Sequence, residues 1–264
     1  MTIKEFVQQE KLRLAEETAS FPRPPHLVII QANDSPASDA YVRGKRKDCE
    51  EVGARSTLCL LPPTVSEAEL LEKVAQYNAD PDVDGLIVQL PLPKHISEAK
   101  VKLAVTPEKD VDGFHPLTTF TPCTPKGIID YLTDIGFDFV GKNAVVLGRS
   151  EIVGKPMARL LLSKHCNVTV LHSRTSEEDK VFYIAHADLI VVAIGKLGFL
   201  DRRFTYKPDA VIVDVGINRN EEGKLRGDAV PDLPVAVQTP VPGGVGLLTR
   251  LALIKNLFIA AKKR

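Results

Sequence analysis

Tyr41 and Lys45 are the first side chains whose types and spacing suggest chemistry, because residues four apart lie on one face of a helix. Both belong to the basic stretch SDAYVRGKRKD. Basic clusters usually lie in water, so we expect the neighbours Arg43, Arg46 and Lys47 to be solvated. Only partners elsewhere in the chain would single out Lys45.

Two further segments carry polar groups at unusual positions. Gln89 lies inside the apolar strand GLIVQL, where an amide without a partner is costly to bury. Asp110 and Asp112 flank a turn in EKDVDGFHP. Each has an ordinary explanation, a satisfied core amide for Gln89 and a turn with a helix cap for the aspartates. We therefore expect a functional role only if these segments act together.

Gly148 and Gly154 mark a nucleotide-binding turn in VVLGRSEIVGKPMARLL. Five residues separate the two glycines and Pro156 follows Lys155, which excludes a Walker A loop; the G-x-G-x-x-G fingerprint is absent as well. A strand, a tight glycine turn and a helix N-terminus remain, and the free N–H groups and dipole of that terminus suit a pyrophosphate. The turn therefore predicts a dinucleotide.

The residues after the next strand favour NADP over NAD. An NAD site usually carries Asp or Glu there for the ribose 2′-hydroxyl, whereas this chain has LHSRT, with Ser173 and Arg174. Arg149 in the preceding turn adds a second guanidinium, and guanidinium groups bind phosphate through charge and paired hydrogen bonds. Arg174 alone is equally explained as a surface residue, but the joint pattern favours NADP.

Helical and strand periodicities alternate nearly throughout the chain, which predicts an α/β fold of parallel sheets covered by helices. The Thr- and Pro-rich segment 118–127 suggests a connection between two lobes. We expect a catalytic α/β domain, 1–118 plus 247–264, and a Rossmann-type NADP-binding domain, 119–246. The last helix is expected to pack back on the catalytic lobe. Strands are predicted at 26–32, 56–61, 85–90, 143–148, 167–172, 188–195 and 210–216, and helices at 3–19, 36–51, 67–78, 125–136, 155–165, 176–186 and 247–262.

Composition excludes several classes of partner. Lys+Arg and Asp+Glu both number 34, so no net positive field favours nucleic acid. No apolar run reaches the roughly 18 residues that span a bilayer. The acidic N-terminus lacks the character of a signal or transit peptide, and the four cysteines lack C-x-x-C spacing. We expect a cytoplasmic protein with no metal and no membrane partner.

Together these segments resemble one family, the bifunctional methylenetetrahydrofolate dehydrogenase/methenyltetrahydrofolate cyclohydrolases. The similarity runs from about residue 27 to the C-terminus and follows the family's order. The matching segments are SDAYVRGK, NADPDVDGLIVQLPLP, EKDVDGFHP, PCTPKG, VVLGRSEIVGKPMARLLL, VTVLHSRT, DVGINR and TPVPGGVG. The combination of VQLPLP with PVPGGVG is highly specific.

The resemblance implies oxidation of 5,10-methylene-tetrahydrofolate to 5,10-methenyl-tetrahydrofolate with NADP, and hydrolysis of the product to 10-formyl-tetrahydrofolate at the same site. It also implies a homodimer that acts on tetrahydrofolate derivatives in one-carbon metabolism and purine biosynthesis. The alternatives are a dehydrogenase with weak cyclohydrolase activity and a non-catalytic folate- or nucleotide-binding paralogue. A binding protein would have no need to keep Lys45.

The family pattern implies a role for each matching residue. Lys45 is the central cyclohydrolase residue, Gln89 tunes that lysine, Asp112 binds the pterin, and Tyr41 stacks on the folate ring system. The other implied substrate-binding residues are Val88, Leu90, Pro242, Gly243, Gly244, Val245 and Gly246. The implied cofactor-binding residues are Gly148, Arg149, Ser150, Ser173, Arg174, Gly195 and Ile217.

The chemistry of the two steps predicts unequal dependence on the lysine. A lysine amine that is removed from water beside the cationic methenyl group gives up its proton more readily, and the neutral amine can assist attack by water. Hydride transfer needs little beyond holding the methylene carbon against the nicotinamide ring. Loss of the lysine is therefore expected to affect hydrolysis more than oxidation.

The chain also departs from the family pattern. The N-terminal L-x-G-K start is shortened or absent, Ala32 stands near a usual glycine, and the loop between GFHP and PCTP is short, without N-x-G-x-L. GDAV replaces the usual G-D-V. After PGGVG the family continues with P-M-T and an aliphatic residue, where this chain has Leu247, Leu248, Thr249 and Arg250. We expect these changes to affect substrate affinity and the balance of activities, and to leave the fold intact.

Overall fold

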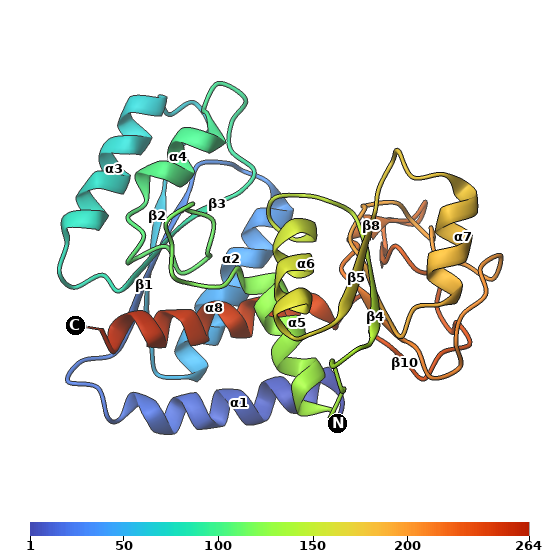
Figure 1. The fold of residues 1–264 in the computed structure, drawn as a ribbon. Coiled ribbons are helices and arrows are strands. Elements are labelled where there is room, and N and C mark those ends of the chain that lie inside the picture. Colours follow the sequence, from blue (N-terminus) through green and yellow to red (C-terminus); the bar gives the residue numbers. More distant parts are fainter. Residues whose placement is uncertain (264) are drawn as a thin grey trace. The chain divides into compact units, whose positions relative to one another are not determined.

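The computed structural model describes residues 1–263, which form two compact units. Among the described residues, the three-stranded unit consists of Val7–Cys123 and 250–263. The five-stranded unit consists of Met1–Phe6 and Thr124–Thr249. Strands and helices alternate along most of the chain (Figure 1), which confirms the predicted α/β fold with two lobes. Among the helices described, none combines the length and apolar character needed to cross a membrane.

The three-stranded unit is built on a parallel sheet in the order β2-β1-β3. All six residues of the central strand are buried, which is typical of a parallel strand covered on both faces. One face packs against α3 and α4 through a core that includes Val28, Leu70 and Val101. The strands are β1 (His26–Gln31), β2 (Arg55–Leu60) and β3 (Gly85–Gln89), and the helices include α2 (Pro36–Glu51), α3 (Glu67–Ala79) and α4 (Glu98–Ala104).

The five-stranded unit holds a parallel sheet in the order β10-β7-β6-β4-β5. Alternate residues of β4 face two cores: Val146 packs with Met157 of α6, and Val145 packs with Ile184 of α7. The strands are β4 (Asn143–Leu147), β5 (Asn167–Leu171), β6 (Leu189–Val192), β7 (Val211–Asp214) and β10 (Val237–Gln238). The helices include α5 (Cys123–Asp134), α6 (Gly154–Ser163) and α7 (Glu177–Ala185), and β8 (Asn218–Arg219) pairs with β9 (Leu225–Arg226).

The order of strands defines where this sheet can hold a ligand. β4, the first strand of the sheet along the chain, lies between β5 and β6, so the connections from β4 and β5 leave in opposite directions. In open parallel sheets this reversal creates a crevice at the carboxyl ends of the strands. The turn after β4 and the loop after β6 meet at that crevice.

Three helices divide between the units, and α5 has only its first residue, Cys123, in the three-stranded unit. α1 (Ile3–Thr18) and α8 (Val245–Ala261) each begin in the five-stranded unit and continue in the three-stranded unit. In the latter, Leu257 of α8 lies so close to β3 that a Cβ on Gly85 would be 2.9 Å from its Cδ1. The last helix therefore packs on the lobe that carries Lys45, as predicted.

The structure also differs in detail from the sequence-based expectations. The last helix begins at Val245 rather than 247, and α4 with the short strands β8, β9 and β10 is not predicted. The compact units change at 6/7, 123/124 and 249/250, and the domain bounds at 118/119 and 246/247 stay a prediction. The 118–122 segment stays with the three-stranded unit because Asn256 of α8 donates a hydrogen bond to the Thr121 carbonyl. The four cysteines are free.

The helix α3 begins with a capping box formed by Ser66 and Glu69. Ser66 Oγ accepts a hydrogen bond from the Glu69 amide, and a Glu69 carboxylate oxygen accepts one from the Ser66 amide. Replacing Ser66 with alanine is expected to lower the free energy of unfolding by about 1 kcal/mol, measured by urea denaturation. Thr64→Ala, at an exposed position just before the cap, is the control; equal midpoints for the two variants would contradict a capping role.

Candidate active site

Helix α2 brings Lys45 to the end of strand β3. Its Nζ atom donates a hydrogen bond of 3.1 Å to Oε1 of Gln89, and the lysine is only 9% exposed. Tyr41, one turn earlier, is 37% exposed. The neighbouring Arg43, Arg46 and Lys47 are exposed, which confirms their predicted solvation. Of these four basic residues, only Lys45 is buried.

The amide of Gln89 is held in one orientation. Its Nε2 atom donates 2.7 Å to the Leu90 carbonyl, so Oε1 is the atom that faces Lys45. Both ends of this half-buried amide are therefore satisfied, which removes the cost of burying it within an apolar strand. A lysine bonded to a neutral oxygen acceptor carries no fixed counter-ion in that bond.

Two residues that sequence reasoning misses join the start of α2 to the segment after β3. Nδ2 of Asn33 donates 2.9 Å to the Pro91 carbonyl, and Oγ of Ser38 donates 3.5 Å to the Leu90 carbonyl. These bonds fix α2 against the Leu90–Pro91 peptide, which is cis. The only signal in the sequence is a set of polar residues beside an apolar strand, which is too common to be predictive.

The loop that carries Asp112 is anchored on either side. Nζ of Lys109 donates to the carbonyls of Tyr77 and Asp80 at the end of α3. Asp110 is buried and accepts 2.7 Å from the His115 amide. Burial raises the pKa of Asp110, and backbone N–H groups of the turn oppose that shift. Asp110 thus stabilises the turn, which is the structural role that the sequence also allows for it. Asp112 is half-exposed.

The charges of Lys45 and Asp112 both influence the pKa of the buried Cys123 thiol. Burial raises the pKa of Cys123 well above its ordinary value; the charge of Asp112 raises it further, and the charge of Lys45 opposes the shift. Cys123 Sγ donates to the Val111 carbonyl, which also accepts 2.9 Å from Asn256 Nδ2 of α8. Lys45 is therefore bonded to Gln89, its charge and that of Asp112 both influence Cys123, and Asn256 binds the neighbouring loop through the Val111 and Thr121 carbonyls.

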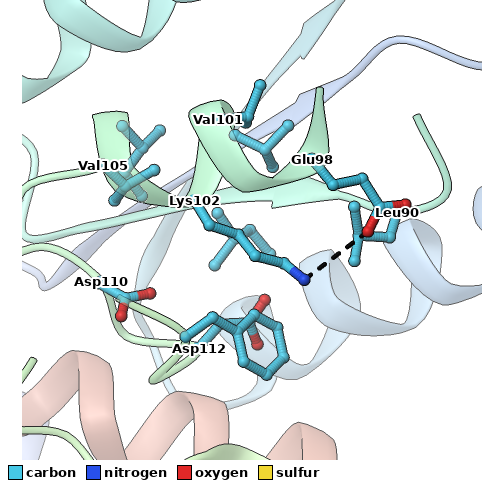
Figure 2. Close-up of a pocket in the computed structure, with 11 residues that line it drawn as sticks. Leu90, Glu98, Val101, Lys102, Val105, Asp110 and Asp112 are labelled. Atoms are coloured by element: carbon cyan, nitrogen blue, oxygen red, sulfur yellow. Dashed lines mark ion pairs between the residues drawn. The ribbon is translucent and has the colours of Figure 1, made fainter. Parts of the chain in front are cut away.

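A pocket lies beside the end of β3 and is shown in Figure 2. Asp112 lines it together with Val88 and Leu90, two of the residues implied for substrate binding. Lys102 of α4 points across the pocket, with its Nζ atom 3.7 Å from a carboxylate oxygen of Glu98. The remaining lining residues are Leu86, Ile87, Val101, Val105, Asp110 and Phe114. Tyr41, Lys45 and Gln89 do not line this pocket, which combines apolar walls with the carboxylates of Glu98, Asp110 and Asp112.

In the five-stranded unit, two glycines allow the turn after β4 to close tightly. Gly148 has φ of +117° and a Cβ there would lie 2.4 Å from the Ala193 carbonyl oxygen. A Cβ on Gly154 would lie 2.3 Å from the Gly148 carbonyl oxygen. Any larger residue would force open the crevice between the ends of β4 and β6. This is the mechanical basis of the turn that the sequence predicts.

The start of α6 differs from the expected free helix terminus. Oγ of Ser150 accepts hydrogen bonds from the amides of Val153 and Gly154, at 3.2 and 3.3 Å. These two amides are therefore not free for a phosphate. The helix dipole remains directed at the turn, where Arg149 and Ser150 are both exposed.

Ser173 and Arg174 follow β5 and are exposed, and residues 172–175 contain no carboxylate. The Arg174 amide donates to Nδ1 of His172, which shapes the turn. Gly195, with φ of +65°, and Ile217, 55% exposed, follow β6 and β7. All the implied cofactor-binding residues thus lie after the carboxyl ends of parallel strands in one sheet.

Asp228 organises the loop after β6, a role that sequence reasoning misses. Its Oδ2 accepts from the amides of Ile194 and Gly195, at 2.8 and 2.9 Å, and its Oδ1 accepts from the Lys196 amide and Asn218 Nδ2. The residue is completely buried. In sequence it is the aspartate of GDAV, the segment that replaces the usual G-D-V.

A second buried carboxylate holds Asp228 in place. Asp214 Oδ1 accepts from the amides of Gly216 and Asp228, and Oδ2 accepts from that of Ala229. Burial raises the pKa of Asp214, and these N–H groups oppose the shift. Two aspartates thus fix the loops after β6 and β7 entirely through backbone donors and one asparagine.

The segment Pro242–Gly246 belongs to the five-stranded unit, whereas Lys45, Gln89 and Asp112 belong to the three-stranded unit. Val245 and Gly246 form the first turn of α8 rather than a loop before it. A Cβ on Gly244 would lie 2.2 Å from the Pro240 carbonyl oxygen, so the preceding bend requires glycine. The role of this segment in folate binding stays a prediction.

Comparison with known proteins identifies the relatives of the chain. Residues 1–112 match the family model "Tetrahydrofolate dehydrogenase/cyclohydrolase, catalytic domain", and residues 122–264 match its "NAD(P)-binding domain". The chain is 49% identical over 266 residues to "Bifunctional protein FolD" of Streptococcus pneumoniae, covering 96% of this chain and 91% of the relative. It is 45% identical over 275 residues to "Bifunctional protein FolD" of Geobacillus thermodenitrificans, covering 98% and 95%.

Solved structures show the same similarity. The bifunctional FolD methylenetetrahydrofolate dehydrogenase/cyclohydrolase of Campylobacter jejuni has a TM-score of 0.94 at 38% identity, covering 99% of this chain and 97% of that one. The methylenetetrahydrofolate dehydrogenase-cyclohydrolase of Trypanosoma brucei, complexed with NADP cofactor and inhibitor, has a TM-score of 0.93 at 31% identity, covering 100% and 97%.

Proposed function

The chain belongs to the tetrahydrofolate dehydrogenase/cyclohydrolase family, and from this we propose how its residues divide the work of the two activities. The enzyme oxidises 5,10-methylene-tetrahydrofolate with NADP and hydrolyses the 5,10-methenyl product to 10-formyl-tetrahydrofolate. The three-stranded unit supplies the folate-binding and hydrolytic side chains, and the five-stranded unit supplies the nucleotide site. The cytoplasmic location, the homodimer and a role in purine biosynthesis stay predictions.

Lys45 acts in the hydrolytic step. A water molecule adds to the cationic methenyl carbon and gives one proton to the neutral Nζ amine, which later passes it to solvent. The bond from that carbon to N5 then breaks, the remaining hydroxyl proton moves to N5, and the formyl group stays on N10. Gln89 places the amine through its 3.1 Å hydrogen bond without a counter-charge that would favour the ammonium form.

Tyr41 and Asp112 hold the folate. Burial raises the pKa of Tyr41 and the charge of Arg250 opposes that shift, so its ring is a neutral phenol near neutral pH and can stack on the pterin. Asp112 presents a carboxylate to the N–H donors of the pterin edge, beside the pocket walls formed by Val88 and Leu90. Both residues bind and orient the substrate.

The residues of the five-stranded unit fit NADP. Gly148 and Gly154 let the turn after β4 pack tightly against protein backbone, so the chain presents backbone rather than bulky side chains where a pyrophosphate would lie. Arg149, Ser173 and Arg174 would hold the 2′-phosphate through charge-assisted hydrogen bonds. When bound, NADP accepts the hydride of the methylene carbon. The loop 194–196, fixed by Asp228, supports the cofactor from the β6 side.

The observation that carries the hydrolytic assignment is the nearly buried Lys45 bonded to Gln89 beside Asp112. A non-catalytic paralogue has no need of this arrangement. Two assays of the purified protein test the function: reduction of NADP that requires 5,10-methylene-tetrahydrofolate, and accelerated loss of added 5,10-methenyl-tetrahydrofolate without nucleotide. We expect both activities, and the absence of both would contradict the proposal.

Arg174→Ala is expected to raise the KM for NADP about tenfold or more, because a charge-assisted hydrogen bond contributes about 1.5–3 kcal/mol. The KM for NAD, which has no 2′-phosphate, should change much less. Steady-state kinetics with both nucleotides measures the difference, with Arg159→Ala on the exposed face of α6 as a matched control. A parallel change for both nucleotides would argue against a 2′-phosphate contact.

A further inference from the structure

We propose that Arg250 is a positioning residue for hydrolysis: by occupying the carboxylate of Asp48, it leaves Lys45 bonded to Gln89. This inference rests on the proposed role of Lys45. Arg250 lies in α8, at a position where the family resemblance leads us to expect an aliphatic residue. Asp48 and Lys45 are three positions apart in α2, close enough on a helix for their side chains to meet.

Asp48 is a nearly buried acid with two cationic partners. Nζ of Lys11, from α1, lies 2.5 Å from Oδ1, and Nε of Arg250 lies 2.9 Å from Oδ2. The second contact is an ion pair without the alignment of a hydrogen bond. The Asp48 side chain is 3% exposed. Lys11 also binds Glu51 at 2.6 Å, and this hydrogen bond lowers the pKa of Glu51.

Gly44 makes room for the guanidinium. A Cβ at this position would lie 1.9 Å from Nη1 of Arg250 and 2.9 Å from its Cζ. Gly44 sits within α2, where alanine would favour the helix more. A side chain at residue 44 would therefore force the guanidinium to leave the position in which it contacts Asp48.

The pairing of Arg250 with Asp48 matters because an Asp48 carboxylate without it could attract Lys45. A buried carboxylate next to a lysine attracts it and stabilises the ammonium form. The ammonium form cannot accept a proton from water. With Oδ1 held by Lys11 and Oδ2 by Arg250, the negative charge is already balanced. Lys45 instead donates to the neutral oxygen of Gln89.

The other charged and titratable groups around Lys45 do not take over the effect of the Asp48 charge on this lysine. On α2 itself these are Tyr41, Asp48 and Cys49; from other elements they are Lys11, Asp110, Asp112, Cys123 and Arg250. Burial raises the pKa of Cys49 to about 12, so this thiol stays neutral. Asp112 is available to the pterin. Asp48, paired with Lys11 and Arg250, is therefore the buried acid of α2 that the inference concerns.

The test is the pH dependence of methenyl-tetrahydrofolate hydrolysis, corrected for the uncatalysed rate, in wild type, Arg250→Met, Gly44→Ala and the double variant Arg250→Met/Asp48→Asn. We expect the midpoint of the pH–rate profile to move up by about one pH unit in the two single variants, with recovery of the rate at high pH. The double variant, which lacks the acid, should return to the wild-type midpoint.

Gly44→Ala keeps the arginine and favours the helix, so its result does not depend on a fold weakened by losing Arg250. A lower rate at every pH with an unmoved midpoint, or a double variant that stays shifted, would overturn the inference. Lys45→Met is measured in parallel. If it hydrolyses like wild type, the proposed function of Lys45 fails; if it is inactive while Arg250→Met is unshifted, only the inference fails.

Discussion

Replacing Lys45 with methionine is expected to slow enzymatic hydrolysis of 5,10-methenyl-tetrahydrofolate by about 100-fold or more, the typical contribution of a positioned proton acceptor. Methionine keeps the length of the side chain and removes the amine that bonds to Gln89. Oxidation of 5,10-methylene-tetrahydrofolate with NADP should persist, because hydride transfer uses no base. The decay of methenyl absorbance and the formation of NADPH measure the two steps separately.

Arg46→Met is the matched control, because Arg46 is the adjacent exposed cation of the same helix. It should leave both rates near those of wild type. Unchanged hydrolysis by Lys45→Met would refute the assignment of this lysine. An equal loss of both activities would show that the methionine disturbs folate binding rather than proton transfer.

Asp228→Ala is expected to destabilise the protein by about 3 kcal/mol or more, since buried donors left without a partner cost about 1–3 kcal/mol each. The change removes the acceptor of three backbone amides and of Asn218 Nδ2. The loop 194–196 would lose its fixed shape, so the KM for NADP should also rise. Chemical denaturation measures stability, and steady-state kinetics measures the KM.

Asp209→Ala, an exposed aspartate of the same unit, provides the comparison for Asp228→Ala. It should change the free energy of unfolding by no more than about 0.5 kcal/mol, as surface substitutions usually do. If Asp228→Ala and Asp209→Ala had the same midpoint and the same KM for NADP, Asp228 would not organise the cofactor loop.

The regular elements could be predicted where local signals are strong. Pro36 in the first turn and Gly53 beyond the end define α2, and Ser66 with Glu69 defines the start of α3. α4 is missed because a helix of seven residues has little periodicity to detect. The start of α8 is placed late because the glycines of PGGVG suggest a loop up to its end.

The candidate site was predictable mainly through the family resemblance. Nothing local relates Lys45 to Gln89, 44 residues away, and the ordinary explanation of each is sound by itself. Asp228 stands in the sequence only as part of GDAV, and its hydrogen bonds to the loop after β6 reveal its role. Arg250 is visible in sequence as a departure, yet its partners Gly44 and Asp48 depend on how α8 packs on α2.

A single time course tests most directly whether this chain performs both reactions. The enzyme is mixed with 5,10-methylene-tetrahydrofolate and NADP, and NADPH and methenyl-tetrahydrofolate are followed together. We predict that NADPH rises while the methenyl signal passes through a low maximum and decays faster than in buffer. Methenyl-tetrahydrofolate that accumulates in step with NADPH and decays only at the buffer rate would contradict hydrolysis by this enzyme.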